Sequence, residues 1–363
     1  MWGRFDPDYS RNRVVRQALA ALGWRVTDFR PRWPPAGDLE AVLRRVPRPD
    51  LVWVPCFRHR DLAAAARWCR RKQVPLVFDP LISQWDKQVF ERGKLAEHGA
   101  AARRLKAREG RLYRRASLVV ADTSEHLHLF AEAFQVPEER LRVVYVGAEA
   151  GGFQVHPQGE WAPGRPIHVL FYGSFIGLQG PGWIVEAARR YQGPPVTWHL
   201  LGAGPLLAEC RARAAGLDNV RFEPWLPYRD LPARIARADV LLGVFGTTAK
   251  AGRVIPNKVF QALACGKPVV TRKSAAYPEA LADGAEHGVR WVAPGDPDAL
   301  AAAVARLAAA PERLPEIGRA ARATFDRYFS ESVIQGQVAE ALRAARGGPG
   351  GHGGAVAAPS PVP

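Results

Sequence analysis

The sequence predicts an α/β protein made of two doubly wound domains, each a parallel sheet covered by helices on both faces. Short, nearly continuous apolar runs alternate with amphipathic helical stretches along almost the whole chain. The length of 363 residues suits about two domains of roughly 150 residues each. A stretch rich in Gly and Pro at 147–166 separates two such alternating sets, so we expect it to link the domains.

The first domain is expected over residues 1–146. Its expected strands are Trp24–Phe29, Leu51–Phe57, Pro75–Phe78, Ser117–Ala121 and Leu141–Val146. The helical patterns between them cover Ser10–Leu22, Leu39–Arg45, Asp61–Lys72, Asp86–Arg115 and Ser124–Phe134. A doubly wound domain should open with a buried strand, yet only Met1–Phe5 precedes a polar stretch. We therefore expect either a short first strand or a natural start upstream of Met1.

The second domain is expected over residues 167–330, with helices between its strands. Those strands are His168–Tyr172, Thr197–Leu201, Val220–Glu223, Val240–Phe245, Pro268–Thr271 and Val289–Val292. A further helical pattern covers 331–345. The remaining residues, 346–363, are mostly Gly, Pro, Ala and Ser, so we expect a disordered tail.

Composition and charge exclude several classes of protein. With 47% hydrophobic residues, the chain has ample apolar surface to fold. The four cysteines form no CxxC motif, which excludes a zinc ribbon or disulfide scaffold and suits a reducing cytosol. No apolar run is long enough to span a membrane, and no secretory signal is evident.

The formal net charge of +16 indicates an anionic partner. Candidates are nucleic acid, an anionic membrane surface and phosphate-bearing small molecules. Nucleic acid is disfavoured because aromatic residues do not alternate with basic ones as they do on single-strand binding platforms. We expect no nucleic-acid partner.

The stretch Ile167–Ala188 contains a candidate phosphate site. An expected strand ends at Gly173, a loop with several glycines follows, and a helix opens near Pro181. Loop N–H groups together with a helix N-terminus can bind phosphate. The alternative is an ordinary turn between strand and helix, in which glycine serves only the backbone geometry.

A second informative stretch runs from Arg253 to Thr271. It predicts a helix that starts near Pro256 and stops at Gly266. Lys258 and Gln261 are three residues apart and share a face near the start of this helix, where they could bind a diphosphate and a sugar hydroxyl. A solvated lysine on a packing helix is the alternative. Further on, Glu279 is either a ligand for a hydroxyl or a carboxylate that stabilises a first helical turn.

These stretches, in this order, resemble the nucleotide-sugar domain of the family-four retaining glycosyltransferases (glycosyl transferases group 1). The most specific part is Pro-Asn-Lys-Val-Phe-Gln-Ala-Leu-Ala-Cys-Gly-Lys-Pro-Val-Val-Thr, followed by Glu279. Leu200–Pro205, Val220–Pro227 and Ala238–Leu242 support it, and the pattern covers about 165–345. The resemblance implies the GT-B fold: two Rossmann-like domains facing a cleft, with a C-terminal helix crossing back to the first domain.

The resemblance also implies which residues bind the donor. They are Gly173, Ser174, Phe175, Gln179, Gly180, Gly202, Leu226, Asn257, Lys258, Gln261 and Glu279. This sequence departs from the family motif, because Arg253 and Gln261 stand where the family has glutamates, and Ser174 and Gln179 where it has Arg and Lys. Lys258 is then the clearest cation for the diphosphate. We count Arg253 among the catalytic candidates and expect a variant subfamily.

In the first domain, loops at the carboxyl ends of the strands should face the cleft. His59 and Asp79 lie in two such loops and could orient or deprotonate an acceptor hydroxyl. Asp6, Tyr9, Arg11 and Asp86 are candidates for the acceptor side. Surface and capping roles are the alternatives.

The pairs Asp6–Asp8 and Asp296–Asp298 superficially match an Asp-x-Asp metal motif. For both pairs we favour capping or turn roles. We therefore predict no metal and no other cofactor.

The expected function is metal-independent transfer of a sugar from a nucleotide-sugar donor to a glycan or lipid-linked acceptor, with retention implied by the resemblance. The helix Arg103–Arg115 is dense in arginine and could rest on anionic headgroups, or it could be a solvated face. We expect a cytoplasmic protein, peripheral at the inner membrane face. The alternatives are a non-catalytic nucleotide-sugar-binding partner and a nucleotide-sugar epimerase of the same architecture.

Overall fold

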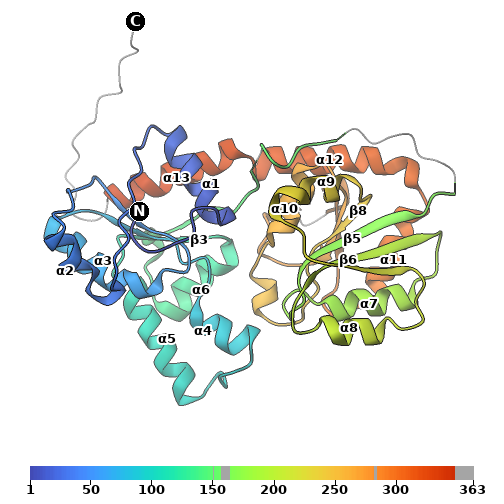
Figure 1. Ribbon diagram of the computed structural model, residues 1–363, viewed down its shortest axis with the longest axis horizontal. Helices are drawn as coiled ribbons and strands as arrows, with labels where there is room; N and C mark the ends of the chain where they lie inside the picture. Colours follow the sequence, from blue (N-terminus) through green and yellow to red (C-terminus); the bar gives the residue numbers. More distant parts are fainter. Residues whose placement is uncertain (150, 157–163, 282–283, 348–363) are drawn as a thin grey trace, which may run out of the picture.

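The computed structural model describes residues 1–149, 151–156, 164–281 and 284–347. Two parallel sheets form separate layered halves that lie side by side, with a pair of C-terminal helices running along one edge of both (Figure 1). The predicted α/β architecture is therefore confirmed. From residue 348 onward, the expected disordered tail lies outside the described residues.

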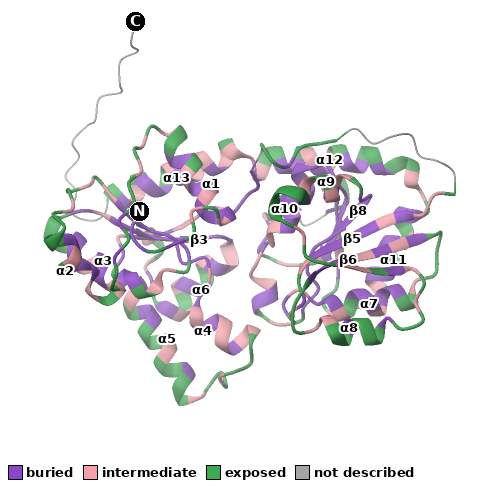
Figure 2. Ribbon diagram, viewed as in Figure 1, coloured by how far each residue is buried: buried purple, intermediate pink, exposed green. Residues whose placement is uncertain are grey.

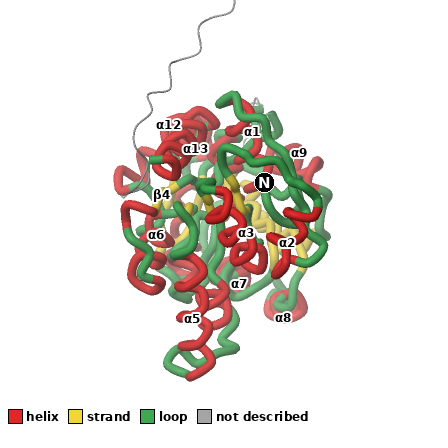
Figure 3. The backbone as a smooth tube through the Cα atoms, turned by 90° about the vertical axis from the view of Figure 1, so that its left-hand side faces the viewer, coloured by secondary structure: helices red, strands yellow, loops and turns green. Residues whose placement is uncertain are grey.

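The sheet of the first domain has the strand order β1-β2-β3-β4, all parallel. The strands are β1 (Val52–Val54), β2 (Leu76–Phe78), β3 (Leu118–Ala121) and β4 (Leu141–Val143). The helices are α1 (Ser10–Ala21), α2 (Gly37–Leu43), α3 (His59–Lys72), α4 (Gln84–Asp86), α5 (Ala100–Tyr113) and α6 (Ser124–Phe134). Nearly every strand residue is buried, because helices cover both faces of the sheet (Figures 2 and 3).

Two expected elements of this domain are wrong in extent. The expected strand Trp24–Phe29 shrinks to one parallel bridge between Phe29 and Trp2. The Trp2 N–H donates to the Trp53 carbonyl, so the first strand is short, as one of the two expectations had it. The expected helix Asp86–Arg115 is broken. After α4 and a short π-helical segment (Lys87–Glu91) the chain turns at Gly93, whose φ is +59°, and α5 starts only at Ala100.

The second sheet has the order β10-β9-β8-β5-β6-β7, all parallel. Its strands are β5 (Ile167–Ser174), β6 (Val196–Ala203), β7 (Val220–Glu223), β8 (Val240–Leu242), β9 (Val269–Arg272) and β10 (Val289–Val292). The helices are α7 (Pro181–Arg190), α8 (Leu207–Arg213), α9 (Leu231–Ala236), α10 (Asn257–Ala264) and α11 (Pro297–Ala308). The strand order reverses between β5 and β8, so a crevice is expected beyond their carboxyl ends.

The C-terminal helices join the two domains. Helix α12 (Leu314–Tyr328) packs on α10 of the second domain, and α13 (Glu331–Arg346) packs on α1, β3 and β4 of the first. Ile334 and Val338 of α13 are fully buried in the core cluster that contains Leu118 and Val120 of β3. The predicted helix that crosses back to the first domain is therefore confirmed.

Candidate donor site between the two domains

The turn after β5 lies at the point where the second sheet reverses its strand order. Gly173 has φ of +147° and Gly180, immediately before α7, has φ of +68°. A Cβ atom at Gly180 would lie 2.7 Å from the backbone nitrogen of Gly246 in the loop after β8. Only glycine allows this close approach of the two loops, and it brings the N-terminus of α7 to the edge of the crevice.

Lys258, in the first turn of α10, is 5% exposed and reaches this turn. Its Nζ atom donates to Oε1 of Gln179 at 2.5 Å and lies 3.8 Å from the ring centroid of Phe171. A Cβ atom at Gly173 would be 3.1 Å from the same Nζ. Among the described residues no carboxylate forms an ion pair with Lys258, and burial lowers its pKa well below the usual value.

Gln261, one turn further along α10, is 2% exposed and bonded through both atoms of its amide. Its Oε1 accepts from the Tyr172 hydroxyl at 2.8 Å, and its Nε2 donates to the Tyr228 hydroxyl at 3.1 Å. The Tyr228 hydroxyl in turn donates to Glu149, the last described residue before residue 150. Gln261, which we expected to bind a sugar hydroxyl, is thus held in a chain of hydrogen bonds inside the protein.

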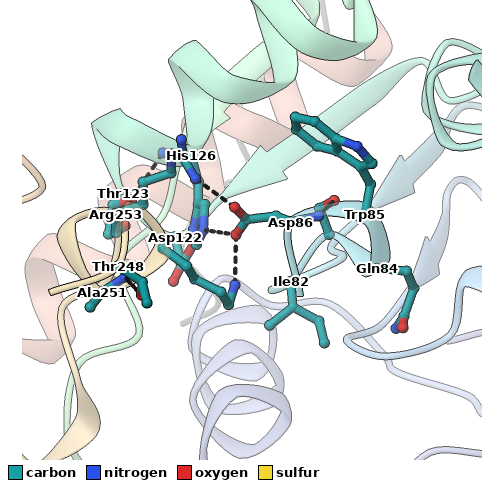
Figure 4. A network of polar contacts seen from close by, with 12 residues as sticks. Ile82, Gln84, Trp85, Asp86, Asp122, Thr123, His126, Thr248, Ala251 and Arg253 are labelled. Carbon is teal, nitrogen blue, oxygen red and sulfur yellow. Dashed lines mark hydrogen bonds and ion pairs between the residues drawn. The ribbon is translucent and has the colours of Figure 1, made fainter. Parts of the chain in front are cut away.

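A buried polar cluster joins the two domains (Figure 4). Asp86, at the end of α4, lies 2.8 Å from Nζ of Lys250 through one carboxylate oxygen and 2.5 Å from a guanidinium nitrogen of Arg253 through the other. His126 on α6 lies 3.9 Å from Asp86 and hydrogen-bonds Asp122. Burial alone would raise the pKa of Asp86, but the His126 hydrogen bond and the Lys250 charge lower it to about 2.

A cavity of about 900 Å³ lies beside this cluster, between the start of α6 and the loops of the second domain. Arg253, Arg272, Lys273 and Glu279 line it from the second domain, and Glu125 lines it from the first. Glu279 is exposed in a single 3₁₀ turn (Glu279–Leu281). Two of the expected site residues, Arg253 and Glu279, therefore share one hollow, whereas Lys258 and Gln179 lie together at the glycine turn.

The other expected donor ligands lie in different settings. Ser174 is exposed at the end of β5, and Asn257 and Leu226 are partly exposed. Gly202, on β6, pairs with Gly173 across the sheet. Phe175 packs in the core of the second domain, and its backbone N–H and carbonyl are both bonded inside that domain. It therefore supports the turn rather than facing a ligand.

The catalytic candidates of the first domain point into that domain. Asp79 is buried and paired with the buried Arg11, at 2.8 Å from Nε, and Arg11 also donates to the carbonyls of Val144 and Tyr145. His59, at the start of α3, contacts the Tyr113 hydroxyl at 3.2 Å, and burial lowers its pKa to about 4. Both side chains are used in internal contacts.

The remaining acceptor-side candidates lie near α1. A carboxylate oxygen of Asp6 accepts from the backbone N–H of Asp8 at 2.9 Å, as in a local turn. The ring of Tyr9 packs edge-on against Phe57, with their centroids 5.0 Å apart, and burial raises the pKa of Tyr9.

The two Asp-x-Asp pairs do not form part of a metal-ligand cluster. Asp296 caps α11, its side chain accepting from the Ala299 N–H at 2.8 Å. Within the described ranges no group of three or more His, Cys, Asp or Glu side chains is arranged to hold a metal ion.

Sequence reasoning missed Lys250, Asp122, His126 and Tyr228. Signals for three of them existed. Lys250 lies in the loop after β8, at the carboxyl edge of the sheet, and Asp122 directly follows β3 with His126 four residues on. For Tyr228 we find no such signal in the sequence.

Each half of the chain matches a family model of known proteins. Residues 3–147 match the model "Glycosyl transferase 4-like domain" and residues 166–310 match "Glycosyl transferases group 1". The chain therefore has the two-domain GT-B architecture, and each half resembles one glycosyltransferase domain. The fold agrees with crystal structures of such enzymes: HepE from Anabaena in complex with UDP has a TM-score of 0.68 at 18% identity, covering 94% of this chain and 98% of its own.

Two curated glycosyltransferases are similar in sequence. The D-inositol 3-phosphate glycosyltransferase of Segniliparus rotundus is 30% identical over 66% of this chain and 55% of its own length. The GDP-mannose-dependent alpha-(1-6)-phosphatidylinositol monomannoside mannosyltransferase of Mycolicibacterium smegmatis is 34% identical over 44% of this chain and 42% of its own. The chain thus spans about half the length of these curated relatives.

Proposed function

We propose that the protein transfers a sugar from a nucleotide-sugar donor to a glycan or lipid-linked acceptor, with retention and without a metal ion. The single observation that carries the proposal is the buried amine of Lys258. It lies beside the glycine turn at the reversal point of the sheet, where it donates to a neutral amide and packs on an aromatic ring. No carboxylate within the described ranges pairs with it. A buried cation in this state favours an anionic ligand.

The reaction requires charge stabilisation at the leaving group. The bond between C1 of the sugar and the β-phosphate oxygen breaks, and its electron pair stays on that oxygen. C1 forms a bond to the acceptor oxygen on the same face, and the acceptor proton passes to the departing phosphate. Lys258 and the backbone N–H groups at the start of α7 stabilise the growing negative charge.

We propose that the sugar and the acceptor occupy the cavity lined by Arg253 and Glu279. The internal contacts of His59 and Asp79 favour a supporting role, in which they hold the loops of the first domain rather than take the acceptor proton. Asp86 positions Arg253 across the domain boundary. Closure of the two domains over the donor would exclude water from it.

The relatives suggest which donors to test first. Structural neighbours are described in complex with UDP and UDP-glucose, and one curated relative is GDP-mannose-dependent. The names of the two curated relatives include an inositol phosphate and a phosphatidylinositol monomannoside. They support polar glycan or lipid-linked acceptors.

A second candidate is a non-catalytic protein that binds nucleotide sugars. It is favoured by one observation: Gln261 and Arg253, which replace the motif glutamates, are both bonded to protein partners. Such a protein would bind the donor without releasing nucleoside diphosphate.

The test begins with thermal shifts in UDP, GDP and ADP, since a ligand selective for the folded state raises the melting temperature. Release of nucleoside diphosphate from the matching nucleotide sugar, with and without a candidate acceptor, is then measured in EDTA. Acceptor-dependent release that persists in EDTA supports the proposal. Binding without release supports the non-catalytic candidate, and a changed sugar still attached to its nucleotide indicates an epimerase.

A further inference from the structure

The first domain presents an apolar surface that the transfer reaction does not use. We call it the α2 surface: Trp33, Leu39, Val42 and Leu43, which are 74, 57, 55 and 83% exposed. They are four of the nine large apolar side chains that are exposed in the described residues. Leu39, Val42 and Leu43 share one face of α2, while Asp38 and Ala41 bury the other. This helix turns an apolar face outward.

Arginines surround this surface. A hollow of about 750 Å³ is lined by Trp33, Leu39 and Leu43 together with four arginines and one carboxylate. The arginines are Arg4, Arg30, Arg32 and Arg44. The carboxylate, Glu40, already accepts from Arg44 at 3.1 Å and from the Arg32 N–H at 2.7 Å. Arg30 also lies 3.5 Å from Asp28, so the four arginines outnumber the two neighbouring carboxylates.

We propose that the α2 surface docks on an anionic lipid bilayer, with its apolar side chains inserted at the headgroup boundary and its arginines on lipid phosphates. Apolar insertion combined with basic residues is the pattern of proteins that lie on membranes. A second copy of the chain is a poor occupant, because the same arginines would face one another in a molecule of net charge +16. None of the helices in the described part has the length and apolar character to cross a bilayer.

The α2 surface suits this role better than the arginine-rich helix α5. The arginines of α5 are exposed, but its Leu105 and Leu112 are only partly exposed and pack on the core of the first domain. Helix α5 can attract anionic lipid but presents no large apolar side chain for insertion. Helix α2 lies at the end of the first domain away from the second, so docking there leaves the interdomain cavity open (Figure 1).

The test is sedimentation of the full-length protein with vesicles, in the absence of any donor. One set is phosphatidylcholine alone, and the other is phosphatidylcholine mixed with phosphatidylglycerol. We expect binding to the mixed vesicles only, and at least about a tenfold weaker partition for the double variant Trp33→Ser, Leu43→Ser. Both side chains are exposed, so the variant should keep the wild-type melting temperature.

Two control variants make the result specific. Trp225→Ser removes an equally large side chain that is 61% exposed on the second domain, and it should bind vesicles like wild type. Arg104→Gln, Arg111→Gln reduces the charge of α5 and should weaken binding less than the α2 double variant. The proposal is overturned by any of three results: no preference for anionic vesicles, unchanged binding of the α2 variant, or a larger loss from the α5 variant. Lipid-free dimerisation that the α2 variant abolishes would assign the surface to a second copy instead.

Discussion

Lys250 and Lys258 are both buried in the second domain, 2% and 5% exposed, but they have different partners. Lys250 forms an ion pair with Asp86 of the other domain, whereas Lys258 has a neutral amide and an aromatic ring beside it. A buried cation with a carboxylate partner stabilises the contact between domains. A buried cation without one indicates where a ligand supplies the missing charge.

The largest effect on stability is expected at Asp86, whose carboxylate pairs with both Lys250 and Arg253. Asp86→Asn leaves the buried Lys250 and the partly buried Arg253 without a counter-charge, so the free energy of unfolding should fall by about 3–5 kcal/mol. Urea unfolding measures it. Asp298→Asn, which breaks an exposed pair with Arg190, is the control and should leave the free energy of unfolding close to that of wild type. Equal losses in the two variants would contradict a special role for the buried pair.

Removing Lys258, which has no carboxylate partner in the described part of the chain, should not lower the stability of the ligand-free protein. Lys258→Met eliminates an amine whose charged form is disfavoured by burial, so the ligand-free protein should be at least as stable as wild type. Affinity for the nucleoside diphosphate found by thermal shift should fall by about 2 kcal/mol, roughly thirtyfold, because a charged hydrogen bond is lost. Calorimetric titration measures it. Lys267→Met, at another buried lysine that donates to the Ala236 carbonyl, should leave the affinity unchanged.

A single substitution can make one lysine resemble the other. Gln179→Glu gives Lys258 the carboxylate partner that Lys250 already has. The new charge should stabilise the ligand-free turn and repel the diphosphate, weakening its binding about tenfold. Gln179→Leu, which adds no charge, is the control. Tighter binding by the glutamate variant would show that the diphosphate lies elsewhere.

The pH dependence should be the smallest effect. The pKa of Lys258 is lowered in the folded protein, so between that pKa and the usual 10.5 the unfolded chain binds more protons and stability rises with pH. A bound diphosphate restores the charge, so binding should take up protons and weaken as pH rises through the same window. Calorimetry in two buffers of different ionisation enthalpy measures the uptake. Uptake that persists in Lys258→Met would assign it to another group.

The second sheet was predicted well because its strands are buried on both sides and leave plain apolar runs. The predicted strand Val240–Phe245 is too long, because only Val240–Leu242 pair as a strand. Val244 packs in a small loop cluster with Leu178 and Ala251 instead. In the first domain, the stretch Trp24–Phe29 contains the charged residues Arg25 and Asp28. Such residues are unfavourable in a strand buried on both faces, and only Phe29 forms a bridge.

The placement of some candidate residues follows from local sequence pattern. The chain has only eight lysines against 43 arginines, and the helical register of Lys258 brings it to the turn after β5. The pairing of Asp86 with Lys250 joins residues 164 positions apart, and no local periodicity reveals such a contact. The same limit applies to Gln261, whose two tyrosine partners come from β5 and from the loop before α9.

The position of α13 has a consequence for biosynthesis. Its Val338 and Leu342 are built into the interior of the N-terminal half, and its Gln337 accepts from the backbone N–H of Tyr145. While the ribosome is still translating the middle of the message, that half lacks one wall and exposes part of its sheet. Its folding therefore waits for residues 331–346 to leave the exit tunnel, which makes early translation products targets for chaperones or proteases.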